Sequence, residues 1–358
     1  MLSPTTKQTA KLTTEQGVRS LYETRHIPAS RRLSAWLLAA IFSLSLCVQQ
    51  AWASPSERTV IPLGKAVGIK LFSDGVLVVG LAEGSSPARS CGLREGDVIT
   101  ALDGEHVDST EQVQSLLSDA AGEEMTLTVR RGAARVSLTA AARQSADGTW
   151  QLGAWIRDSM AGIGTLTYYD PATGQYGALG HGITDVDTAQ LMPLASGSIM
   201  ETTVKAVKKG VKGDPGELKG DFSVQRDVGT VTVNSDGGIF GTVADPDFLA
   251  GGTPVPVAAA RQINTGPATI LSTVSGSDTA EYTVEIVRLY GAEEPTRNML
   301  LRITDPRLLS ATGGIVQGMS GSPILQNGRI VGAVTHVLLN DPTRGYGIFI
   351  ENMLDRAG

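Results

Sequence analysis

Short runs of β-branched and other apolar residues, separated by glycine-rich turns, recur from about residue 60 to the end of the chain. They include 76–79, 230–233, 282–287 and 329–334. Glycine supplies 42 of 358 residues, which favours many tight turns. No strand pattern alternates with a long helical one, so a parallel α/β sheet is disfavoured. The sequence therefore predicts a mainly β protein, and its length predicts more than one domain.

Charge and the metal-binding residue types exclude several classes of function. The formal net charge of −6 argues against a nucleic-acid-binding surface. The two cysteines, Cys47 and Cys91, are too few for a disulfide framework or a cysteine-based zinc site. The four histidines are scattered without ligand spacing. We therefore expect no metal, no cofactor and no nucleic-acid partner.

The N-terminal region has the pattern of an export segment. An uncharged, mostly apolar run at 33–48 follows a basic flank, and residues 51–53 form an A-x-A cleavage signal. Within residues 1–53, six basic side chains stand against two acidic ones, a balance of +4. We predict a cytoplasmic segment at 1–32 and a signal or membrane anchor at 33–53, with the remainder exported. Both a cleaved signal and a retained anchor fit this pattern.

Residues 60–142 form a unit with its own pattern of strands and helices. It contains the run 92–99, Gly-Leu-Arg-Glu-Gly-Asp-Val-Ile, followed by the turn Asp103-Gly104. A helix is predicted to start at Ser109, with Gln112 completing a capping box. The unit resembles a PDZ domain, which binds a peptide by adding it as a strand beside a helix. The alternative is a small sheet domain that only packs on its neighbour.

By this resemblance, three residues near the start of the unit form the loop that captures a peptide carboxylate. They are Val67, Gly68 and Ile69. A glycine at the centre allows a peptide backbone to approach closely. We therefore predict peptide binding at these three residues.

Residues 150–358 are strand-rich throughout and follow a polar break at 143–149. Residues 164–169 and 176–179 flank the turn 170–174 and predict a hairpin. About 200 residues of short antiparallel strands fit a double barrel or a sandwich.

A serine between glycines carries the strongest chemical signal in this region. In the run Gly318-Met319-Ser320-Gly321-Ser322-Pro323, a tight turn exposes the Ser320 hydroxyl. The amides of Gly318 and Ser320 are placed to bind the oxyanion of an acyl-transfer intermediate. Ser322 is the alternative nucleophile, but only Ser320 has glycines placed to form that pocket.

A histidine and an aspartate complete a candidate triad. His181 ends a predicted strand between two glycines, and Asp305 precedes Ser320 by fifteen residues. The order His181, Asp305, Ser320 is that of chymotrypsin-like peptidases, whereas an α/β-hydrolase requires Ser, Asp, His. Two alternatives stay open: His336 as the base, although a structural role suits it better, and Asp185 or Asp187 as the carboxylate.

Residues 150–355 resemble the SpoIVB peptidase family. The resemblance places the family's catalytic histidine, aspartate and serine on His181, Asp305 and Ser320. It implies a chymotrypsin-like, β-barrel-type serine peptidase domain. The matching stretches are 162–167, 177–181, 185–188, 313–323, 332–337 and 340–342.

The resemblance also implies a biological role. Members are exported across the forespore membrane, initially anchored, into the intermembrane space. There they cleave themselves and a regulatory subunit of the membrane complex that processes pro-sigma-K. Two other functions fit the sequence: a catalytically silent PDZ adaptor, and an HtrA-like quality-control protease. The second is disfavoured because the PDZ unit precedes the peptidase segment here.

Overall fold

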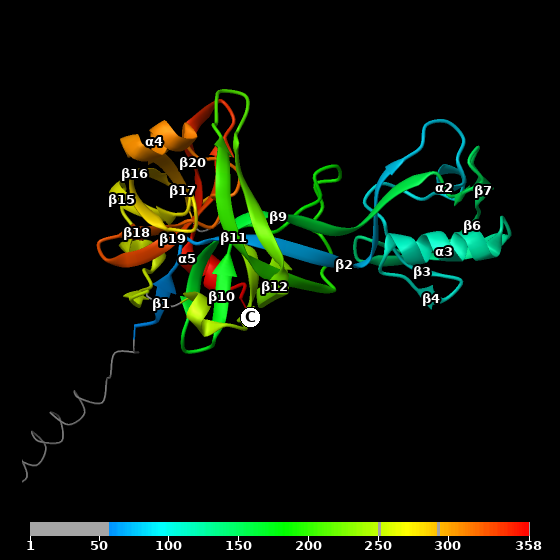
Figure 1. Ribbon diagram of the computed structural model, residues 1–358, viewed down its shortest axis with the longest axis horizontal. Helices are drawn as coiled ribbons and strands as arrows, with labels where there is room; N and C mark the ends of the chain where they lie inside the picture. The colour runs from blue at the N-terminus through cyan, green and yellow to red at the C-terminus, as the bar shows by residue number, and fades with distance from the viewer. Residues whose placement is uncertain (1–56, 250–251, 292–293, 358) are drawn as a thin grey trace, which may run out of the picture. The chain divides into compact units, whose positions relative to one another are not determined.

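The computed structural model describes residues 57–249, 252–291 and 294–357 (Figure 1). Strands make up 54% and helices 11%, so the prediction of a mainly β protein is confirmed. The predicted segments 1–32 and 33–53 lie outside the described residues. Among the helices described, none has the length and apolar character needed to cross a membrane.

Six antiparallel strands pair in a closed ring in the first half of the peptidase region. Their order around the ring is β2, β9, β10, β13, β12, β11 and back to β2. Strand β1 pairs with β9 and with β14. The bounds are β1 Thr59–Pro62, β2 Ala66–Leu81, β9 Ala154–Asp170, β10 Gln175–Ala178, β11 Ser196–Lys208, β12 Glu217–Ser235, β13 Gly238–Val243 and β14 Val255–Pro256.

A second closed barrel follows, with the strand order β15, β16, β17, β20, β19, β18. Alternation explains why its strands form: in β16, Tyr282, Val284 and Ile286 are buried in the barrel core while their neighbours are more exposed. Of the two arrangements that fit residues 150–358, a double barrel and a sandwich, the structure has two barrels, but the first of them also includes β2 from before residue 150. The bounds are β15 Gly266–Ser272, β16 Ala280–Leu289, β17 Met299–Ile303, β18 Pro323–Gln326, β19 Arg329–Leu338 and β20 Asp341–Phe349.

Four short helices lie in this half of the chain: two between β13 and β15, one between β17 and β18 of the second barrel, and one after β20. Two are α-helical and two are single 3-10 turns, and they are α4 Pro306–Thr312, α5 Ile350–Leu354, η1 Pro246–Leu249 and η2 Ala260–Gln262.

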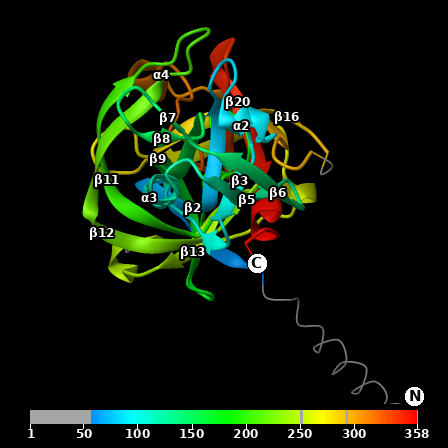
Figure 2. The same cartoon turned by 90° about the vertical axis from the view of Figure 1, so that its right-hand side faces the viewer.

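The PDZ-like part contains α2, α3 and the strands β3, β5 and β6 (Figure 2). Buried side chains from these elements form a separate hydrophobic core. The predicted capping box is confirmed, because Ser109 and Gln112 exchange hydrogen bonds at the start of α3. Val113 and Leu117 of α3 are buried in this core. The bounds are α2 Pro87–Ser90, β3 Val98–Leu102, β4 Glu105–His106, α3 Thr110–Ala120, β5 Glu124–Arg131, β6 Ala134–Ala141, β7 Arg143–Gln144 and β8 Trp150–Gln151.

Strands β2 and β9 serve both parts of the molecule. Residues 66–72 of β2 pair with β9 and β11 in the first barrel, whereas Val76 and Leu77 pair with β3 in the PDZ-like part. Residues 154–157 of β9 continue the pairing with β2 beyond the barrel. Residues 60–72, which the sequence pattern assigned to the PDZ unit, therefore belong to the peptidase region: 60–62 pair with β14 and β9, and 66–72 form part of the first barrel.

This placement corrects the predicted carboxylate loop. Val67, Gly68 and Ile69 are hydrogen-bonded to strands on both sides, so they offer no free edge to a peptide. Val67 and Ile69 are buried in the barrel core. A Cβ atom on Gly68 would lie 2.7 Å from the Phe222 side chain, so this glycine permits packing in the barrel instead of ligand approach.

Candidate functional site

The candidate nucleophile Ser320 lies in a tight loop that leads into β18. Gly318 and Gly321 on either side have φ values of +98° and +97°, which favour glycine. A Cβ atom on Gly321 would lie only 2.0 Å from the carbonyl oxygen of Thr165. Gly318 and Gly321 are therefore required because their backbone conformation favours glycine and, at Gly321, because there is no room for a side chain.

The backbone of this loop leaves two hydrogen-bond donors open. The amides of Met319, Gly321 and Ser322 donate to carbonyl groups, whereas those of Gly318 and Ser320 donate to no acceptor among the residues the structure describes. An incoming carbonyl oxygen can take both. This arrangement fits the predicted oxyanion site.

Thr165 of β9 fixes this loop from the first barrel. Its buried hydroxyl donates to the Gly318 carbonyl at 2.7 Å, and its amide donates to the Ser320 carbonyl at 3.0 Å. The Ser320 hydroxyl itself donates to the Thr335 carbonyl at 2.7 Å. The hydroxyl is thus held in place, but its proton points to a backbone oxygen.

His181 follows β10 through two residues with left-handed backbone, Leu179 and Gly180. Its Nδ1 lies 2.8 Å from the Gly182 carbonyl oxygen. Because a carbonyl only accepts, Nδ1 carries the proton and Nε2 keeps its lone pair. Burial lowers the pKa of His181, although the Gly182 carbonyl acts against this. The imidazole is therefore a neutral base at neutral pH.

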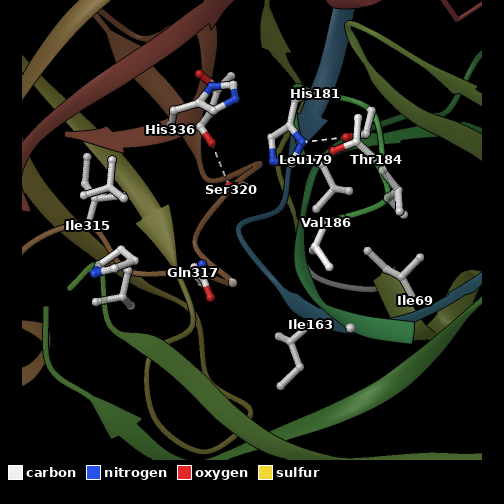
Figure 3. A pocket seen from close by; sticks show the side chains of 18 of the residues that line it. Ile69, Ile163, Leu179, His181, Thr184, Val186, Ile315, Gln317, Ser320 and His336 are labelled. Atoms are coloured by element: carbon white, nitrogen blue, oxygen red, sulfur yellow. Dashed lines mark hydrogen bonds between the residues drawn. The ribbon is translucent and has the colours of Figure 1, made fainter. Parts of the chain in front are cut away.

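His336 of β19 is the residue whose position sequence reasoning missed. Its ring centroid lies 5.1 Å from that of His181, and both line the pocket that contains Ser320 (Figure 3). Its Nδ1 is buried and has no hydrogen-bond partner in the described part of the chain, so it is not the satisfied structural histidine that we expected. Burial, with His181 and Arg297 nearby, lowers its pKa to about 4.

The pocket has a volume of about 470 Å³ and is lined from both barrels. Ile69 and Ile163 come from the first barrel, and Ile315 and Val337 come from the second. Residue Ile69, expected to bind peptide in the PDZ unit, thus reaches the pocket of Ser320 instead. The pocket is large enough for a substrate side chain.

The predicted carboxylate is not brought to His181. Asp305 caps α4, where its buried carboxylate accepts from the Arg307 and Thr283 amides and from the Arg307 guanidinium at 2.8 Å. The Arg307 guanidinium holds the pKa of Asp305 well below its usual range. Asp305 lies outside the lining of the pocket.

The alternative carboxylates are also engaged elsewhere. Asp185 is buried and accepts from Arg157, from the Thr188 side chain and from the amides of Asp187 and Thr188. Burial acts to raise the pKa of Asp185, but these hydrogen bonds lower it overall. Asp187 pairs with Arg157 at 3.0 Å. Within the described residues, the Gly182 carbonyl, and no carboxylate, accepts from His181.

A groove with an open strand edge does occur in the PDZ-like part. It lies between α3 and residues 151–156, which include the start of β9. There β9 pairs with β2 on one side, and no described strand pairs with its other edge. Trp155 at this edge is 59% exposed. This groove therefore has a free strand edge beside a helix.

Comparison with known protein families identifies both parts. A PDZ domain family matches residues 79–131, and the family described as SpoIVB peptidase S55 matches residues 148–354, more than half of the chain. The chain belongs to the SpoIVB peptidase S55 family. It is therefore a serine peptidase that carries a PDZ domain, and its substrates are proteins.

Solved structures show weaker likenesses. The inactive form of the Rv3671c protease is 17% identical, with a TM-score of 0.31 over 55% of this chain and 82% of that one. The active form from M. tuberculosis is 17% identical, with a TM-score of 0.30 over 56% and 73%. The PDZ domain of an SdrC-like protein from Listeria monocytogenes is 24% identical, with a TM-score of 0.21 over 23% and 87%. No curated protein matches the chain.

Proposed function

We propose that this S55 peptidase is an endopeptidase in which Ser320 is the nucleophile and His181 is the general base. The observation that carries the proposal is the pair of open amides beside Ser320, in one pocket with a neutral imidazole. Rotation of the Ser320 hydroxyl away from Thr335 directs its proton to Nε2 of His181. The oxygen then attacks the peptide carbonyl carbon.

The same residues carry the charges that develop during the reaction. The amides of Gly318 and Ser320 bind the oxyanion, and the Gly182 carbonyl accepts from Nδ1 of the protonated His181. His181 then gives its proton to the leaving amine, and water releases the acyl group from Ser320. In this proposal a backbone carbonyl orients the imidazole, and Asp305 supports the fold of the nucleophile's barrel.

The test is labelling of the full chain with a fluorophosphonate, followed by peptide hydrolysis. Ser320→Ala and His181→Ala should each abolish labelling and hydrolysis, and the double variant should lose little more because the two act as a unit. His106→Ala, an exposed histidine in the PDZ domain, is the matched control and should label fully. Full labelling of Ser320→Ala would overturn the assignment, and a wild-type chain that never labels would favour the adaptor function.

We further propose that the enzyme acts in sporulation signalling, as the name of its family suggests. In this role it is exported across the forespore membrane, held at first by residues 33–53, and cleaves itself and a regulatory subunit of the pro-sigma-K processing complex. A reporter fused after residue 60 should be active only outside the cytoplasm. Purified enzyme should cleave the regulatory subunit in membranes, and Ser320→Ala enzyme should not.

The PDZ groove between α3 and β9 is proposed to dock the peptide segments that the enzyme cleaves. Trp155→Asp should weaken peptide binding, measured by fluorescence anisotropy, without changing fluorophosphonate labelling. A change at Gly68 cannot test this, because a side chain there meets Phe222 in the barrel. Unchanged peptide affinity in Trp155→Asp would exclude this groove.

A further inference from the structure

The lining of the pocket beside Ser320 is mainly apolar and carries no acidic, lysine or arginine side chain. Twelve of its lining residues are aliphatic, methionine or proline, among them Ile69, Ile163, Ile315 and Val316. A charged substrate side chain would lose its hydration there without gaining a partner, which is costly. An apolar side chain would gain from leaving water.

Two exposed apolar side chains stand at this pocket. Val186 is 80% exposed and Leu339 is 57% exposed, and both line the cavity that contains Ser320 and His181. They are two of only six large apolar side chains exposed in the described part of the chain. Exposed apolar groups grouped at a cavity mark binding surfaces.

The loop that carries Val186 is held rigidly by its neighbours. Asp185 is fully buried, accepts three hydrogen bonds from Asp187 and Thr188, and pairs with Arg157. Thr184 and Leu191 form a bridge that closes the base of the loop. This explains the Asp185-Val186-Asp187-Thr188 motif, which the catalytic chemistry does not use: its polar residues fix the loop, and Val186 is presented outward.

Leu339 comes from the second barrel, and the loop between β11 and β12 of the first barrel holds its backbone. It follows β19 in the turn to β20, and its carbonyl accepts from the Gly213 amide at 2.7 Å. The rim of the pocket therefore has one apolar residue from each barrel, and hydrogen bonds fix the backbone around each of them. A preformed site of this kind binds with little ordering cost.

We propose that this pocket selects an apolar side chain of the substrate next to the scissile bond, with Val186 and Leu339 as specificity-determining residues and Asp185 as the residue that positions Val186. The inference rests on the proposed catalytic role of Ser320. The substrates it names are proteins with an aliphatic residue at the cleavage site.

The experiment uses the full chain with a peptide set in which one position near the scissile bond is Leu, Asp or Lys. Wild-type enzyme should cleave the Leu peptide best. Val186→Asp should lower kcat/KM for the Leu peptide about tenfold, mainly through KM, because one apolar contact contributes discrimination of about that size. It should favour the Lys peptide, and Val186→Lys should favour the Asp peptide.

Val211→Asp is the matched control, because Val211 is 58% exposed but lies outside the pocket lining. It should leave the order of peptides unchanged. If wild-type enzyme labels with fluorophosphonate but cleaves charged peptides best, or if Val186→Asp and Val186→Lys share the wild-type order, the inference is overturned while the peptidase assignment stands. Loss of both labelling and cleavage in wild-type enzyme would overturn the peptidase assignment itself.

Discussion

The hydroxyl of Thr165 should control catalysis from a position that never touches substrate. It is fully buried and donates to the carbonyl of Gly318, whose amide is one of the two proposed oxyanion donors. Thr165→Val keeps the shape of the side chain and removes only this hydrogen bond. The Gly318 carbonyl is then left without its partner, and the peptide units of the loop are free to turn.

The expected losses of stability and of kcat in Thr165→Val follow from the loss of the hydrogen bond to the Gly318 carbonyl. An unpartnered carbonyl in this position costs about 1–3 kcal/mol of unfolding free energy. For a chain of this size that lowers Tm by about 2–6 °C. Complete loss of an oxyanion donor lowers kcat by about 10²–10³. A donor that is only misaligned should lower kcat by about tenfold, with little change in KM because ground-state binding is spared.

Thr167 supplies a control on the same strand. It is also fully buried, but its hydroxyl has no hydrogen-bond partner among the residues that the structure describes. Thr167→Val should therefore leave kcat unchanged and leave stability equal or raise it. Steady-state kinetics and thermal melts of both variants are the assay. If Thr165→Val lowers Tm but keeps kcat within about twofold of wild type, Thr165 is a structural residue and the reasoning fails.

Three further predictions concern titration and the carboxylate. Because burial lowers the pKa of His181, the acid limb of the kcat/KM profile should lie below pH 6.5, and a limb above that value would contradict a buried base. The pKa of His336 is about 4 in the folded chain and 6.5 in the unfolded chain. Between pH 4 and 6.5 the unfolded chain therefore binds more protons than the folded chain. The free energy of unfolding should fall as the pH drops from 6.5 to 4. His336→Gln should flatten this dependence, and an unchanged slope would show that another group causes it. Asp305→Asn should lower unfolding free energy by about 1 kcal/mol, because asparagine can still cap α4 but loses the ion pair with the Arg307 guanidinium, and activity should recover on cooling. A drop in kcat of about 10⁴ at unchanged stability would instead restore Asp305 to a triad.

Local features of the fold were predictable because local sequence determines them. The capping box of Ser109 and Gln112 is a contact across three residues. The alternation of β16 specifies which face is buried whatever strand lies beside it. The need for glycine at 318 and 321 follows from a serine on a tight turn. Each of these predictions depends on a few consecutive residues.

Features that depend on strand partners were not predictable. Val67, Ile69 and Leu71 alternate as in a strand, but this pattern does not say which strands lie on either side, and so Val67–Ile69 was misplaced as a peptide-binding loop. The approach of His336 to His181 likewise depends on packing between two barrels. For Asp305 a signal did exist: aspartate followed by proline is typical of a helix N-terminus, and α4 begins there.

Strands β2 and β9 run through both hydrophobic cores, and this limits where the chain can be divided into independent domains. Many multidomain proteins gain or lose a domain by recombination within a linker. Here a cut between the cores severs two strands that are hydrogen-bonded to each other. A fragment with the PDZ family's bounds, 79–131, also lacks residues 151–156, which form one wall of its groove. The PDZ domain and the peptidase are thus expected to be inherited, and to unfold, as one body.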